Sequence, residues 1–164
     1  MMSSQILGRN EKYTVAILIM VAFCLLTLSP AFAIEPVNKT SDGVAIKGYD
    51  PVAYFINGKP MKGSRDFEHL WMGAKWRFST AGHKDLFIKD PDKYAPKYGG
   101  YCAYAVSQGT TADIDPEAWS IVAGKLYLNI SKKIRDKWNK DLPGNIRKAD
   151  ENWPGILKKS AERR

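Results

Sequence analysis

Two segments in which hydrophobic and polar residues alternate, each interrupted by a glycine turn, predict two β-hairpins. Residues 67–71 and 75–78 flank Gly73, and residues 119–122 and 125–130 flank a second glycine turn. In the strand over 75–78 the two aromatic residues fall on one face and the two basic residues on the other. One face of this hairpin is therefore expected to lie on the core.

The segments between the hairpins predict short helices, each bounded by a capping residue or a breaker. Asp50 can cap a helix and Pro51 suits its first position, so a helix should follow to about Ile56. Ser79 or Thr80 can cap a second helix that runs to about residue 89. Further helical segments are predicted over residues 90–98, 101–107, 131–142 and 145–153, the last ending at Trp153-Pro154. This pattern indicates an α+β fold, with a small antiparallel sheet of two hairpins and short helices packed around it.

The amino-terminal residues have the features of an export signal. Arg9 and Lys12 precede an uncharged apolar run over residues 15–28, and Ala31-Phe32-Ala33 offers small residues at a cleavage site. We expect cleavage near Ala33 and a periplasmic or secreted protein. An uncleaved membrane anchor is the alternative. The expected division is a signal peptide over 1–33, a flexible leader over 34–46, a domain over 47–157 and a basic tail over 158–164.

The charge of the chain does not point to nucleic acid. The net charge is +8 at pH 7, but the lysines are scattered and export separates the protein from nucleic acid. Membrane contact is expected only through the amino-terminal segment, if that segment is uncleaved. The high aromatic content, 12% of residues, predicts a core of large rings rather than a stacking surface for bases or sugars. A metal ion or a small molecule is the expected partner.

Cys102 is the first candidate for chemistry, because Cys24 lies within the signal and Cys102 is then the only cysteine left. It follows Gly99-Gly100 and falls in the first turn of the predicted helix over 101–107, where the helix dipole favours a thiolate. Three roles stay open for it: a buried core side chain, a metal ligand, or a reactive thiol.

His83 is the second candidate. It lies in the first turn of its predicted helix, where the dipole favours the neutral imidazole that binds metals. The sequence contains no Cys-x-x-Cys, no His-x-x-x-His and no Gly-x-Ser-x-Gly motif. A dense metal site and a serine hydrolase are therefore not indicated, and we expect a binding protein rather than an enzyme.

Several motifs together resemble the YHS domain family, in its exported single-domain branch. They are Gly48-Tyr49-Asp50-Pro51-Val52-Ala53-Tyr54-Phe55, Trp76-Arg77-Phe78-Ser79, Asp90-Pro91, Tyr98-Gly99-Gly100-Tyr101-Cys102-Ala103, Gly124-Lys125-Leu126-Tyr127-Leu128-Asn129 and Trp153-Pro154. The similarity spans residues 44–156. It implies a small α+β domain of a kind suspected to bind metals.

The sequence departs from the metal-type members of that family at three positions. The resemblance implies cysteines at three positions of the metal-type members. This chain has Ala53, Ser79 and His83 at those positions. We therefore expect a soft or borderline metal ion, such as copper or zinc, with Cys102 and His83 as its ligands. The alternatives are a thiol redox protein that uses Cys102, and a non-catalytic small-ligand or structural module in which Cys102 is buried.

Overall fold

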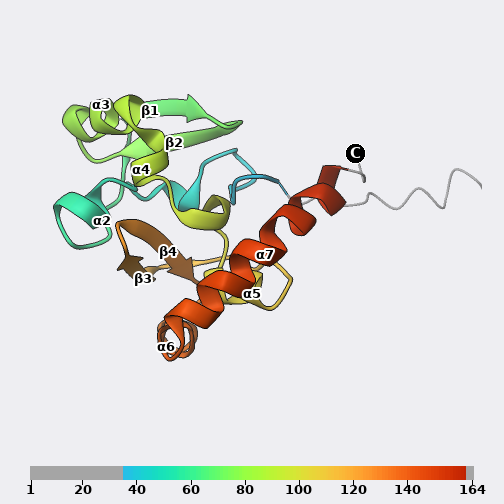
Figure 1. The fold of residues 1–164 in the computed structure, drawn as a ribbon. Helices are drawn as coiled ribbons and strands as arrows, with labels where there is room; N and C mark the ends of the chain where they lie inside the picture. Colours follow the sequence, from blue (N-terminus) through green and yellow to red (C-terminus); the bar gives the residue numbers. More distant parts are fainter. Residues whose placement is uncertain (1–34, 162–164) are drawn as a thin grey trace, which may run out of the picture. The chain divides into compact units, whose positions relative to one another are not determined.

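The structure, a computed structural model, describes the backbone of residues 35–161 and the side chains of residues 35–159. The strands are β1 (Ser64–Trp71), β2 (Ala74–Phe78), β3 (Asp115–Val122) and β4 (Lys125–Asn129). The helices are α2 (Ala53–Ile56), α3 (Ala81–Lys89), α4 (Pro91–Tyr94), α5 (Ala103–Ser107), α6 (Lys132–Asn139) and α7 (Leu142–Ala161), with the 3-10 segments η1 (Ile46–Gly48) and η2 (Lys97–Gly100) (Figure 1). The α+β fold is confirmed.

The expected signal peptide over residues 1–33 lies outside the described residues. Within residues 35–161, no helix combines the length and the apolar composition that crossing a membrane would require.

Both predicted hairpins are present, as two separate antiparallel sheets. In the first, Trp76 pairs with His69 across β1 and β2, and Trp76 is buried on the core side while Lys75 is exposed. The turn of each hairpin has two residues with positive φ, of which the second is glycine. Such turns match the right-handed twist of the strands, and this geometry explains the glycines that mark both hairpins in the sequence.

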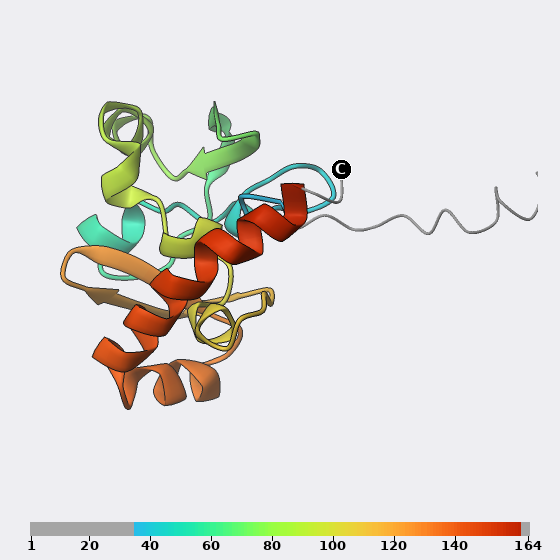
Figure 2. The same cartoon turned by 45° about the vertical axis from the view of Figure 1, so that its right-hand side comes forward.

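The carboxy-terminal helix is longer than the sequence predicts. α7 begins at Leu142 and continues through Pro154 to Ala161, so the expected end at Trp153-Pro154 is wrong. Pro154 removes one backbone hydrogen bond, but Ile156 beyond it is 6% exposed and packs into the core. Burial of that side chain offsets the lost bond. α7 packs along α5 (Figures 1 and 2), and Lys158 belongs to this helix rather than to a separate tail.

The segment expected to be a flexible leader joins the folded unit. Val37, Ala45 and Ile46 are at most 2% exposed and belong to the main hydrophobic cluster. The backbone of residues 38–46 forms bridges, and Ala45 N–H donates to the Lys75 carbonyl at 3.0 Å. Residues 37–46 therefore pack with the domain that was expected to begin at residue 47, because their apolar side chains belong to the same hydrophobic cluster as β2.

Strand β4 connects two hydrophobic clusters. Leu126 and Leu128 face the first cluster, which contains Trp76, while Tyr127 faces the second, which contains Trp138. All of these side chains are at most 4% exposed. Because successive side chains of a strand point to opposite faces, one short strand covered on both faces supports both clusters.

In the segment Tyr98-Gly99-Gly100 the backbone lies so close to Pro36 that Gly99 has no room for a side chain. Both glycines have positive φ, 60° at Gly99 and 77° at Gly100. A Cβ added at Gly99 would fall on the carbonyl oxygen of Pro36, and Asn38 N–H donates to the Gly99 carbonyl at 2.8 Å. This contact attaches the residues after Pro36 to η2.

An alanine in the left-handed conformation costs roughly 1–2 kcal/mol relative to glycine. We expect Gly99→Ala to lower the free energy of unfolding by more than this amount, because the added Cβ also meets Pro36. Gly58→Ala is the matched control, since Gly58 has φ 61° and no atom within 4 Å of an added Cβ. Chemical denaturation of both variants measures the difference. Equal destabilisation would contradict the proposed close contact.

Candidate functional site

Cys102 is a core residue. It is 1% exposed and stands at the N-cap of α5, one residue before the helical turn in which the sequence placed it. Its thiol donates to the side-chain oxygen of Asn129, with 3.7 Å between sulfur and oxygen. Its backbone bridges to Leu128 of β4. The sulfur therefore lies between α5 and β4, inside the main hydrophobic cluster.

This environment favours the role of a packed sulfur among the three that the sequence left open. Reactive cysteines occupy electropositive and partly exposed sites, whereas buried structural cysteines are inert. Asn129 is itself 0% exposed, and its side-chain nitrogen has no hydrogen-bond partner among the described residues. Tyr104 N–H donates to the Asn129 oxygen at 3.2 Å, so this amide is fixed between the cysteine and α5.

His83 lies at the start of α3, as predicted, and contacts a buried carboxylate. Thr80 caps the helix and accepts from His83 N–H at 3.1 Å. The ring nitrogen Nδ1 lies 2.6 Å from Oδ2 of Asp50. Because a carboxylate only accepts, Nδ1 donates in this bond and Nε2 is the ring atom left for another partner. The His83 side chain is 12% exposed.

Asp50 accepts hydrogen bonds from several donors of this site. We call Asp50, Ser79 and His83 together the carboxylate clamp. Its Oδ1 accepts from the backbone N–H groups of Val52 (2.9 Å) and Ala53 (3.2 Å) at the start of α2. Its Oδ2 accepts from Ser79 N–H (2.8 Å), Ser79 Oγ (2.6 Å) and His83 Nδ1. The carboxylate is 0% exposed and holds α2 to the end of β2 and the start of α3.

The clamp does not have the geometry of a Ser-His-Asp hydrolase. In that triad the serine and the aspartate contact opposite nitrogens of the histidine ring. Here Ser79 Oγ lies 3.3 Å from Nδ1, the same nitrogen that contacts Asp50. The serine hydroxyl bonds to the carboxylate and is not positioned for activation. We interpret the clamp as a fixed polar connection.

The two metal-ligand candidates have different partners: Cys102 contacts Asn129, and His83 contacts Asp50. Among residues 35–159, no three side chains of His, Cys, Asp or Glu come together as a metal-binding group. The Cys102–His83 metal site therefore stays a prediction and gains no third ligand from the described part of the chain.

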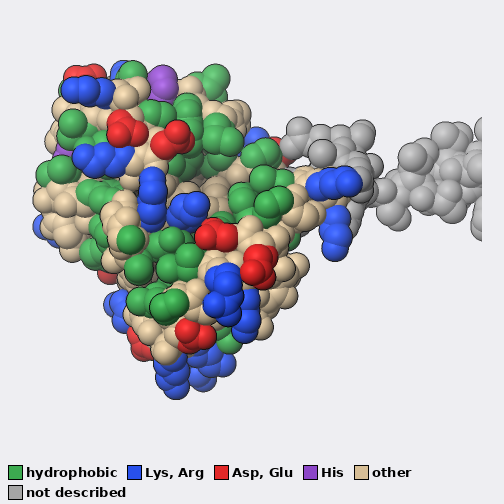
Figure 3. Space-filling view, viewed as in Figure 1, with side chains coloured by type: hydrophobic (Ala, Val, Ile, Leu, Met, Phe, Trp, Pro, Cys, Tyr) green, Lys and Arg blue, Asp and Glu red, His purple; other side chains and the backbone are tan. Residues whose placement is uncertain are grey.

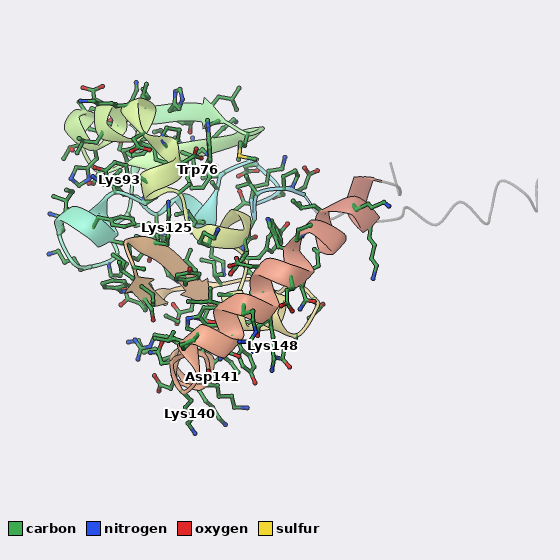
Figure 4. The ribbon with its side chains drawn as sticks, viewed as in Figure 1. Trp76, Lys93, Lys125, Lys140, Asp141 and Lys148 are labelled. Atoms are coloured by element: carbon green, nitrogen blue, oxygen red, sulfur yellow. The ribbon has the colours of Figure 1, made fainter. Side chains whose placement is uncertain are left out.

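A cavity of about 360 Å³ lies elsewhere, and we call it the aromatic groove. Its apolar lining includes Val37, Trp71, Trp76, Tyr98, Trp153 and Leu157. Its charged lining consists of Asp92, Lys97 and Lys125. Figure 3 shows a hollow on this face with basic side chains among hydrophobic ones, and Figure 4 places Trp76 and Lys125 on the elements that border it.

Packing of the rings with one another fixes the walls of the aromatic groove. Trp71 of β1 contacts Trp76 of β2 edge to face at 5.7 Å, and Trp76 Nε1 donates to the Trp71 carbonyl at 3.0 Å. On the opposite side, Tyr98 contacts Trp153 of α7 at 5.9 Å. Tyr98 OH donates to Asp150 at 3.0 Å, and burial together with this bond raises the pKa of Tyr98 well above its ordinary value. These rings are held before any ligand arrives.

The sequence did not reveal the groove, because its residues come from segments more than a hundred positions apart. The one available signal was the number of aromatic residues, which we interpreted as core. That interpretation holds for Trp76, which is 1% exposed, but Trp71 and Trp153 are only partly buried.

Comparison of the chain with family models, with curated proteins and with solved structures gives no match. The resemblance to YHS domains stays a prediction from the motifs.

We expect Asp50→Asn to lower the free energy of unfolding by about 3 kcal/mol, because the new amide NH2 would face donors and the buried bonds would lose their charged acceptor. Ser79→Ala removes one donor of five and should cost about 1 kcal/mol. Asp85→Asn, at an exposed position of the same α3, is the control. Urea denaturation measures these free energies of unfolding. If Asp50→Asn is no more destabilised than Asp85→Asn, the clamp does not stabilise the fold.

We expect Cys102 to resist iodoacetamide in the native protein and to react once the protein is unfolded, because its sulfur is enclosed. Peptide mapping by mass spectrometry of the full chain locates the label and distinguishes Cys102 from Cys24. Rapid native labelling at Cys102 would instead support the reactive thiol.

Proposed function

We propose that this protein is an exported, non-catalytic module that binds a small organic molecule in the aromatic groove. The observation that carries the proposal is a preformed cavity of about 360 Å³ lined by four large rings. Ligand pockets in proteins are mostly apolar, few in number and typically about 300–1,000 Å³ in volume, with a few polar groups that orient the ligand. The volume of the groove lies within this range, and its lining combines large rings with three charged side chains.

The surroundings of Cys102 and His83 support binding over chemistry. A thiol enclosed beside Asn129 offers no accessible nucleophile, and a histidine whose Nδ1 is bound to Asp50 contributes a single ring nitrogen. The groove is lined by neither residue. The proposal therefore assigns Cys102 to packing and His83 to the clamp, and corresponds to the small-ligand alternative that the sequence left open.

The export part of the proposal rests on the sequence of residues 1–33. The charged start, the apolar run and the small residues near Ala33 support secretion. A binding module outside the cytoplasm would meet its ligand in solution or at a membrane surface. The amount of the protein in a periplasmic fraction, compared with that of a cytoplasmic marker, tests this part separately.

A neutral fluorescent probe tests the groove directly. We expect N-phenyl-1-naphthylamine to bind the full chain with saturable fluorescence enhancement, because its rings can lie against Trp71 and Trp153. Trp71→Leu and Trp153→Leu should each weaken binding by about tenfold, since each removes one aromatic wall.

Trp119→Leu is the matched control, because Trp119 is also partly buried but packs on Tyr54, away from the groove lining. Circular dichroism and thermal unfolding establish that each variant is folded. Absence of saturable binding, or an equal loss in all three variants, would overturn the proposed function.

A further inference from the structure

We propose that the ligand of the aromatic groove is a flat apolar organic anion, whose carboxylate or similar acidic group binds at Lys125 and Lys97. This inference rests on the proposed function and adds the charge of the ligand to it. Two lysines and one aspartate line the groove. Lys97 lies 4.0 Å from Asp150, outside the lining, whereas Lys125 belongs to no ion pair of the described residues, so the unpaired positive charge beside the rings is that of Lys125. Charge complementarity therefore selects an anion over a neutral molecule or a cation.

Lys125 is the main anchor, because its ammonium group is held at the groove and forms no ion pair among the described residues. It begins β4, and its Nζ donates to the backbone carbonyl of Asp92 at 3.0 Å, which holds the side chain at the groove. An ammonium group has three donors, so two stay available. Among the ion pairs of residues 35–159, none includes Lys125. A ligand carboxylate would supply the missing partner.

Lys97 on η2 is a second cation of the groove lining. Its Nζ lies 5.7 Å from the centre of the Tyr98 ring and 4.0 Å from Oδ1 of Asp150, at the outer limit of an ion pair. Its side chain is 40% exposed. Asp150 also accepts from Tyr98 at 3.0 Å and keeps its negative charge beside Lys97. A ligand anion would share Lys97 with Asp150, so Lys97 is the weaker of the two contacts.

Asp92 sets the position of the anion within the groove. It is the one acidic side chain of the lining. Its carboxylate forms no ion pair with Lys125 among the described residues. A ligand anion near Asp92 would be repelled. The acidic group should therefore contact the lysine ammonium groups rather than the carboxylate of Asp92, with the flat body against Trp71 and Trp153.

Two probes of equal shape test the inference. We expect 2-naphthoate to bind the full chain at least about fivefold more tightly than neutral 2-naphthamide at low ionic strength, as measured by isothermal titration calorimetry. The preference should shrink as salt is raised, since salt screens exposed charges. 2-Naphthylmethylammonium should bind more weakly than the amide.

Lysine variants assign the preference to residues. Lys125→Gln should weaken naphthoate binding more than naphthamide binding and so remove most of the preference for naphthoate, and Lys97→Gln should remove a smaller part. Lys125→Arg, which keeps the positive charge, should retain the preference. Lys148→Gln is the matched control, because Lys148 is exposed on α7 and does not line the groove (Figure 4).

The outcomes separate the two proposals. If neither naphthoate nor naphthamide binds, the proposed function fails. If both bind equally, or the amide binds more tightly, the groove binds ligands but the inference about charge is wrong. If Lys125→Gln and Lys148→Gln reduce the preference equally, the preference arises from the overall charge of the protein, and the assignment to Lys125 is overturned.

Discussion

The hydrogen bonds of one buried carboxylate, Asp50, determine how the first half of the domain is assembled. An enclosed carboxylate without partners would be strongly destabilising, and its cost is offset here only because donors arrive from α2, from Ser79 and from His83 together. Those donors come from positions up to 33 residues away. The bonds therefore join the end of β2, the strand that carries Trp76, to the starts of α2 and α3.

The groove is formed where three separately supported segments meet. The first hairpin brings Trp71, η2 brings Tyr98, and α7 brings Trp153. Each segment is held by its own contacts: the clamp behind the hairpin, the Gly99 carbonyl beneath η2, and the bond from Tyr98 to Asp150 on α7. A cavity with walls held in this way loses little conformational freedom when a ligand binds, which favours affinity.

Local features of the sequence predicted the hairpins and most helix starts, because strand alternation, glycine turns and capping residues act over a few positions. The same local rules failed at Pro154, where burial of Ile156 outweighs the loss of one hydrogen bond. They also failed for the segment from Val37 to Ile46, whose burial depends on β2. Of the candidate site, His83 at a helix start was predictable, whereas its contact with Asp50 and the groove itself required the tertiary structure.

The clamp also gives a physical account of the departure from the metal-type YHS pattern. The three positions at which that resemblance places cysteines, Ala53, Ser79 and His83, come together here around Asp50, since each donates a hydrogen bond to its carboxylate. A thiolate cluster at this point would place several negative charges beside a buried anion, which is costly unless a metal ion compensates for them. Here the side chains of Ser79 and His83 and the backbone N–H of Ala53 donate to Asp50 instead. In this chain, then, the side chains of Ser79 and His83 stabilise the fold by supplying donors to a buried carboxylate.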